Sequence, residues 1–133
     1  METSVQQVIE QSARASYQGT RTFREHLAAL AAVGVEAYQA DYRARSTCYY
    51  LRSGETHRIA LSAPELAIPA ALDDAALAAA IKAAQRGELK YREFLARSVA
   101  AGVVGYIVWI DARKVTYFGR DGELHVEPFP SAS

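Results

Sequence analysis

The sequence has one cysteine, Cys48, and no long hydrophobic run, and each absence excludes a class of protein. A single cysteine cannot form an internal disulfide or supply a cysteine-rich zinc site, which favours a reducing compartment. The longest apolar run, residues 101–110, is half of the roughly 20 residues that cross a bilayer, and the first residues lack a secretory signal. We therefore expect a cytoplasmic protein without a membrane partner.

Net charge is absent as well. The 15 lysine and arginine residues balance 15 aspartate and glutamate residues, so no long-range positive field attracts a phosphate backbone. Nucleic acid is therefore not an expected partner. A length of 133 residues, with half of them hydrophobic, fits one domain that spans residues 1–133 around a single core.

The chain matches itself when it is shifted by 68 positions. Gly19–His57 aligns with Gly87–His125 without a gap, and 16 of the 39 pairs are identical. This similarity predicts an internal duplication, with repeats at about 4–60 and 73–128. A connector that contains Pro64 and Pro69 joins them. We expect the two repeats to be related by a pseudo-twofold axis.

Each repeat has the pattern of two helices followed by three strands. Capping-box patterns start helices at Ser4 and Thr22, and an aspartate at 73 or 74 starts the third, whereas Lys90 is a weaker start for the fourth. After Gly34 and Gly102 the hydrophobic period changes from 3.6 to 2. The expected strands are 35–42, 47–52, 103–110 and 115–120, with a third strand after each pair. The fold class is α+β, with antiparallel sheets, helices on one face, and strand 103–110 in the middle and covered on both faces.

Two short loops, Ser53-Gly54 and Asp121-Gly122, predict hairpins with two-residue turns. Such turns fix which residues face each other across each hairpin. The predicted opposite pairs are Arg52 with Glu55, Tyr50 with His57, Arg120 with Glu123, and Phe118 with His125. Because apolar residues then gather on the other face, this register places both histidines on the more open face of the sheet.

Two interpretations of these eight residues stay open. In the first they are structural: arginine and glutamate form exposed pairs worth about 0–1 kcal/mol, and each histidine stacks on an aromatic ring. In the second they bind a ligand: the histidines, with Glu55, Glu123 and Glu127, line one groove near the pseudo-twofold axis and hold a small anion, a peptide or a metal ion. No metal-ligand spacing is present, and no cofactor or catalytic residue is identified.

Other candidates are weaker. Cys48 shares a face with Tyr50, but the second repeat has Thr116 at the matching position, which favours a structural role. No phosphate-binding loop or dinucleotide fingerprint occurs. The tyrosines that both repeats keep are interpreted as core packing; these are Tyr38, Tyr49, Tyr106 and Tyr117.

The second repeat has the motifs Gly102-Val103-Val104-Gly105-Tyr106, residues 117–122 (Tyr-Phe-Gly-Arg-Asp-Gly) and His125-Val126-Glu127-Pro128. With these motifs the chain resembles domain-of-unknown-function family 1398 over nearly its whole length. The family is bacterial, some members lie in prophages, and some are labelled phage envelope proteins. The resemblance implies a phage-related protein, but no activity, cofactor or site residue.

We therefore predict a non-enzymatic binding or regulatory module, a monomer or homodimer that takes a protein partner or a small ligand. The alternative is an enzyme or metal-binding protein that uses the histidine and glutamate face.

Overall fold

The computed structural model describes residues 1–63 and 67–130, and these contain two successive sets of two helices and three strands. The first set is α1 (Thr3–Gln18), α2 (Phe23–Ala32), β1 (Val35–Asp41), β2 (Ser46–Leu51) and β3 (Thr56–Ala60). The second set is α3 (Asp74–Gln85), α4 (Tyr91–Ala100), β4 (Val103–Trp109), β5 (Lys114–Gly119) and β6 (Leu124–Pro128). Pro64, part of the predicted connector, lies outside the described residues.

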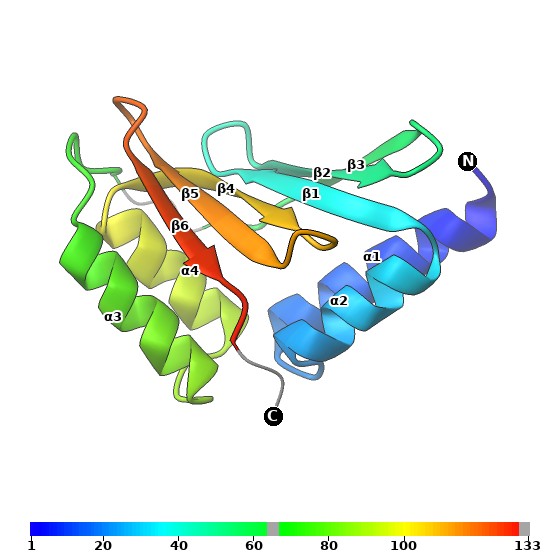
Figure 1. The fold of residues 1–133 in the computed structure, drawn as a ribbon, viewed down its shortest axis with the longest axis horizontal. Helices are drawn as coiled ribbons and strands as arrows, with labels where there is room; N and C mark the ends of the chain where they lie inside the picture. The colour runs from blue at the N-terminus through cyan, green and yellow to red at the C-terminus, as the bar shows by residue number, and fades with distance from the viewer. Residues whose placement is uncertain (64–66, 131–133) are drawn as a thin grey trace.

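The six strands form one antiparallel sheet in the order β3-β2-β1-β4-β5-β6. The two halves therefore join edge to edge, because β1 pairs directly with β4, and the α+β class is confirmed. All four helices lie under one face of this sheet, and no helix formed by residues 1–63 or 67–130 covers the other face (Figure 1). Strand β4 is central as predicted, but it is covered on one face only, and the side chain of Trp109 is 38% exposed.

The helices begin for local reasons that the sequence carries. The Thr22 hydroxyl accepts a hydrogen bond from the Glu25 amide, and the Glu25 carboxylate accepts one from the Thr22 amide, which confirms that capping box. Asp73 accepts a hydrogen bond from the Ala76 amide and caps α3. The capping box predicted at Ser4 is wrong, because α1 begins at Thr3 without a side-chain cap.

Gly102 connects α4 to β4 at a point where the chain is crowded. Its φ is +97°, and a Cβ atom there would lie 2.4 Å from the carbonyl oxygen of Ala71, in the connector between the halves. Gly34 occupies the matching place in the first half with φ +92° but has open space around it. The backbone conformation is thus the same in both halves, whereas the close approach belongs to the second.

The core lies between the helices and the covered face of the sheet. Its fully buried members come from every layer and include Ile9, Leu30, Val35, Leu77, Leu95, Val99, Val103 and Val108. Burial of apolar surface at about 25 cal/mol per Å² holds the two helix pairs against the strands. Among the described residues, no helix combines the length and hydropathy that a membrane span requires.

Candidate functional site

Both outer hairpins turn through three residues, where the sequence analysis expected two. The Leu51 amide donates to the Glu55 carbonyl at 2.9 Å and the Gly54 amide to the Leu51 carbonyl at 2.9 Å, so Arg52 to Gly54 form the loop. Gly54 has φ +92°, the left-handed conformation that closes a three-residue hairpin loop. The second hairpin has the same bonds 68 positions later.

This register overturns the predicted cross-strand pairs. His57 lies opposite Tyr49, and His125 lies opposite Tyr117. The wrong pairs are Arg52 with Glu55, Tyr50 with His57, Arg120 with Glu123, and Phe118 with His125. A shift of one residue moves every side chain of a strand to the other face, so the histidines lie on the helix-covered face and not on the open one.

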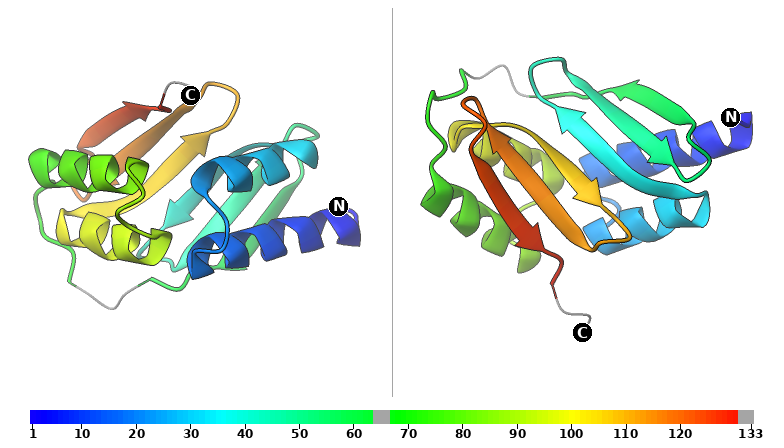
Figure 2. Two further views of the ribbon diagram at one scale, coloured as in Figure 1. Left: turned by 90° about the horizontal axis from the view of Figure 1, so that it is seen from below. Right: turned by 45° about the horizontal axis from the view of Figure 1, so that its top comes forward.

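The two histidines also lie far from each other. They belong to β3 and β6, the two edge strands, which five strand spacings of about 4.8 Å separate by roughly 24 Å. Both views of Figure 2 show these strands at opposite edges of the sheet. The prediction of one groove that holds both histidines near the middle of the sheet is therefore wrong.

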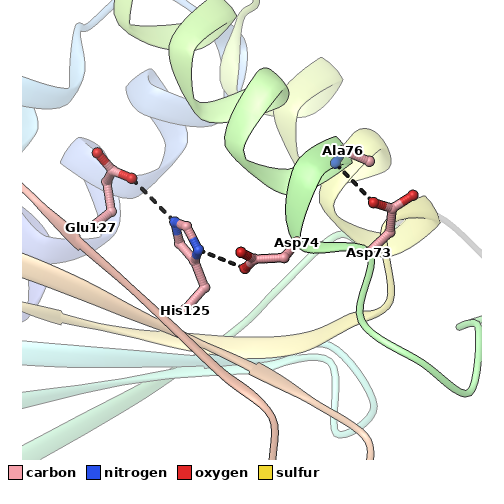
Figure 3. Close-up of polar contacts among 5 residues, drawn as sticks. All are labelled: Asp73, Asp74, Ala76, His125 and Glu127. Atoms are coloured by element: carbon pink, nitrogen blue, oxygen red, sulfur yellow. Dashed lines mark hydrogen bonds and ion pairs between the residues drawn. The ribbon is translucent and has the colours of Figure 1, made fainter.

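Each histidine contacts an acidic residue of a neighbouring element. The Nε2 atom of His57 lies 3.5 Å from a carboxylate oxygen of Glu10 on α1. His125 lies between two carboxylates, with Nδ1 2.8 Å from Asp74 and Nε2 3.1 Å from Glu127 (Figure 3). Since these carboxylates meet opposite nitrogens of the ring, they cannot share one metal ion with it. Among the described residues, no group of three His, Cys, Asp or Glu side chains is placed to hold a metal ion.

The remaining charged residues of the first hairpin make separate contacts. Arg52 donates to Asp111 at 2.6 Å, across to the loop between β4 and β5. Glu55 contacts the terminal ammonium group of Met1 and accepts a hydrogen bond from the Ser53 hydroxyl at 3.1 Å. These contacts connect loops to their neighbours; Glu55 also lines a depression on the open face together with Tyr50, whereas Arg52 does not.

In the second hairpin the matching residues hold the connector. Arg120 donates to the carbonyl of Ile68 at 3.0 Å, and the Glu123 carboxylate accepts from the amides of Leu72 and Asp121 at 2.9 and 3.0 Å. These backbone hydrogen bonds lower the pKa of the Glu123 carboxyl. Glu123 thus fixes the chain just before α3.

Tyr50 and Phe118 lie on the open face of the sheet, on β2 and β5. Tyr50 and Trp109 border a shallow depression of about 370 Å³ there, and the Trp109 indole donates to the Thr116 hydroxyl at 3.1 Å. Cys48 shares this face with Tyr50, as predicted from their spacing.

A larger hollow lies on the other side of the sheet, between the two helix pairs. It measures about 1250 Å³, and its floor carries Tyr38, Tyr49, Tyr106 and Tyr117, one from each of the four inner strands. One wall comes from α1 and α2 and the other from α3 and α4, which lie side by side under the sheet (Figure 2, left). We call this space the interhelical cavity.

The tyrosines of the floor are buried but carry spare hydrogen-bonding capacity. The Tyr106 hydroxyl is 2.8 Å from that of Tyr91, whereas among the described residues the hydroxyls of Tyr38, Tyr49 and Tyr117 have no hydrogen-bond partner. Burial raises the pKa of every one of these phenols, that of Tyr91 to about 12. They are therefore neutral at pH 7 and able to donate into the cavity.

A third histidine, His26 of α2, lines the same cavity and is only 4% exposed. Its Nδ1 atom lies 2.7 Å from the Ser12 hydroxyl, and among the described residues Nε2 has no hydrogen-bond partner. Burial first, and the charge of Arg21 second, lower the pKa of His26 to about 4, so the ring is neutral at pH 7.

His26 was not among the predicted site residues, because the matching residue of the second half is Phe94 and the histidine is not shared. The signal that could have found it is its spacing of four residues from Leu30. That spacing puts a polar ring on the buried stripe of a well-bounded helix.

Comparison with known proteins gives a family without an assigned activity. The model of the family described as "Protein of unknown function (DUF1398)" matches residues 51–128. The uncharacterized proteins Rv2012 of Mycobacterium tuberculosis and Mb2035 of Mycobacterium bovis are each 39% identical to the chain over 59 residues, 44% of its length. The aligned part spans only 36% of these relatives. Because the family model covers more than half of the chain, the protein belongs to the DUF1398 family.

Proposed function

We propose that this protein binds a small molecule with an apolar body in the interhelical cavity. The observation that carries the proposal is the set of three tyrosine hydroxyls, on side chains at most 6% exposed, that have no hydrogen-bond partner among the described residues. Each of these hydroxyls keeps some surface open to the cavity, so a molecule that enters can accept a hydrogen bond from it. Most polar groups inside proteins are paired, and acceptor atoms of a ligand would pair these three.

The size and chemistry of the cavity support this function. Small-molecule sites usually measure about 300–1,000 Å³ and are mostly apolar, with a few polar groups that fix orientation. The interhelical cavity, at about 1250 Å³, has room for such a ligand and for water. Aromatic faces give large contact area, and the phenol groups give direction.

The proposal includes the internal duplication and a pseudo-twofold axis between β1 and β4. Three observations support them: the symmetric strand order, the bulges near the starts of β1 and β4, and the positive φ of Arg45 and Arg113, which lie 68 positions apart. Each half then contributes one wall and half of the tyrosine floor. The cavity lies across the axis, so the complete site needs both halves.

Binding without chemistry fits the surroundings of the contact between Ser12 and His26. Ser12 is 0% exposed and does not line the cavity, so its hydroxyl is out of reach of a bound molecule. A nucleophile must meet the reacting atom, and this serine instead joins α1 to α2. We therefore propose a binding protein and not a hydrolase.

The test uses N-phenyl-1-naphthylamine, a neutral apolar dye whose emission rises in apolar sites. We expect saturable binding to one site, and we expect Ala84→Phe to abolish it, because Ala84 lines the cavity from α3. Ala79→Phe is the matched control, since Ala79 is exposed on the same helix and does not line the cavity. Absence of dye binding, or equal binding by Ala84→Phe and wild type, would contradict the proposal.

A further inference from the structure

The two edge strands of the sheet, β3 and β6, differ at the positions that the duplication relates. Among the described residues, each of these strands pairs on one side only. The middle residue of β3 is the exposed Arg58, and the matching residue of β6 is Val126, which is 51% exposed. Thr56 of β3 likewise corresponds to Leu124, which is 60% exposed. Because an exposed charge on an edge strand discourages pairing with another chain, β3 is protected at its centre and β6 is not.

The hydrogen bonds at the two ends of β6 fix which backbone groups of this strand point outward. The Glu123 carbonyl accepts from β5 at 2.9 Å, and the Phe129 amide donates to the residue before β5 at 2.9 Å. Bonded positions alternate along an antiparallel pair, so the odd-numbered residues of β6 bond to β5 and the even-numbered ones point away. The outward residues are Leu124, Val126 and Pro128, and among the described residues their backbone groups have no hydrogen-bond partner.

A second copy of the chain fits this edge, because β6 is complementary to itself. In an antiparallel pair of β6 strands with Val126 on the twofold axis, the two valines exchange both backbone hydrogen bonds, and each Leu124 amide donates to a Pro128 carbonyl. This register sets His125 opposite Glu127 of the second copy, so each carboxylate lies between its own imidazole and that of the other copy. An axis at Glu127 would instead set two carboxylates directly opposite each other, which is destabilising.

The other edge strand does not offer the same self-pairing. An antiparallel pair of β3 strands about Arg58 would set two guanidinium groups directly opposite each other. Pairing of β6 with β3 of a further copy would not close on itself and would continue as a filament. A twofold pair of β6 strands closes after two copies and leaves the protected β3 strands as the edges of the joined sheet.

We infer that this protein forms a homodimer through β6, in which the two sheets join into one antiparallel sheet. The inference goes beyond the proposed function and does not depend on the interhelical cavity. Strand β6 has five residues, so the pair of strands is short. Because small interfaces bind weakly, we expect an equilibrium between monomer and dimer that depends on protein concentration.

Sedimentation equilibrium of the full chain at concentrations up to about 1 mM tests the inference. In the wild type we expect the average mass to rise with concentration from 14.5 kDa toward twice that value. Val126→Arg installs the residue of β3 and should lower the association constant about tenfold or more, because like charges then meet on the axis. Ile107→Arg is the control and should associate like the wild type, because Ile107 lies on the open face in β4, away from the edge.

A mixture of two variants tests the position of the axis. Val126→Arg and Val126→Asp should each weaken association, whereas their equimolar mixture should recover it, because opposite charges then meet on the axis. If either variant fails to fold by circular dichroism, amide exchange of the wild type still decides: exchange at Leu124 and Val126 should slow as the concentration rises.

Four results would each overturn the inference. They are a wild type that stays monomeric at every concentration, loss of association in Ile107→Arg, no recovery in the mixture of folded variants, and a mass that grows beyond two chains. Amide exchange at Leu124 and Val126 that does not change with concentration would contradict it as well.

Discussion

The Ser12 hydroxyl and Nδ1 of His26 lie 2.7 Å apart, and this buried contact joins α1 to α2. The matching positions in the second half are Ala80 and Phe94, which are buried and apolar. The first half thus has a buried polar contact between its two helices, where the second half has two buried apolar residues. The polar version adds a titrating group to the core.

His26 makes the stability of the protein depend on pH. Burial lowers its pKa from 6.5 to about 4, so the unfolded chain binds a proton before the folded one does. The free energy of unfolding therefore falls as the pH drops from 6.5 to 4, by about 3 kcal/mol for a shift of this size. Urea denaturation of His26→Phe at pH 7 and pH 4.5 should show a smaller fall than the wild type; equal falls would contradict this prediction.

The hydroxyls of Tyr91 and Tyr106 form a hydrogen bond with each other, at 2.8 Å. Tyr91→Phe removes the partner of a Tyr106 hydroxyl on a side chain that is 7% exposed, and we expect it to lower the free energy of unfolding by about 1–3 kcal/mol. Tyr17→Phe is the control, since among the described residues the Tyr17 hydroxyl has no hydrogen bond to lose. Thermal unfolding measures both, and equal effects would exclude a role for the hydroxyl pair.

A comparison of alanine variants at Gly34 and Gly102 separates the cost of backbone strain from the cost of steric crowding. Gly34→Ala should cost about 1 kcal/mol, because it forces alanine into a left-handed conformation in open space. Gly102→Ala has the same conformation and also collides with the Ala71 carbonyl, so we expect a loss of about 3 kcal/mol. Denaturant midpoints of the two variants show which loses more stability. Similar losses would show that the connector at Ala71 moves away to make room for the added methyl group.

The Glu123 carboxylate should control how tightly the segment before α3 is held. Glu123→Ala removes the acceptor for the amides of Leu72 and Asp121, so hydrogen exchange at these two amides should accelerate. Exchange in α4 and β4 should not change. Glu88→Ala serves as the control, because the exposed Glu88 carboxylate pairs with its exposed neighbour Arg86. Unchanged exchange at Leu72 would mean that other contacts hold this segment.

The elements followed from the sequence, whereas the register of the outer hairpins did not. Ser53-Gly54 fits a two-residue turn, but it equally fits the end of the three-residue loop that begins at Arg52. The residue pattern of strand β6 did not reveal the error in the register. Leu124 and Val126 are apolar and suggest a buried face, yet they are 60% and 51% exposed. One residue of uncertainty in the turn was enough to reverse the face of both histidines.

The interhelical cavity depends on the separation of the two helix pairs, which no local sequence pattern predicts. The tyrosines shared by both halves were recognised, and they are buried as predicted. Their role in lining a cavity depends on the separation of two helix pairs that share one sheet. That separation is set by side-chain volumes along the whole interface. His26 was not predicted, because it is a residue in which the two halves differ and no shared pattern marks it.

Trp109 is the one tryptophan in the chain, and it lies on the open side of the sheet, away from the tyrosine floor. Its emission wavelength consequently reports which side of the molecule is occupied. A compound lodged between the helix pairs should leave that wavelength unchanged, whereas a macromolecule that covers the strands should shift it to the blue.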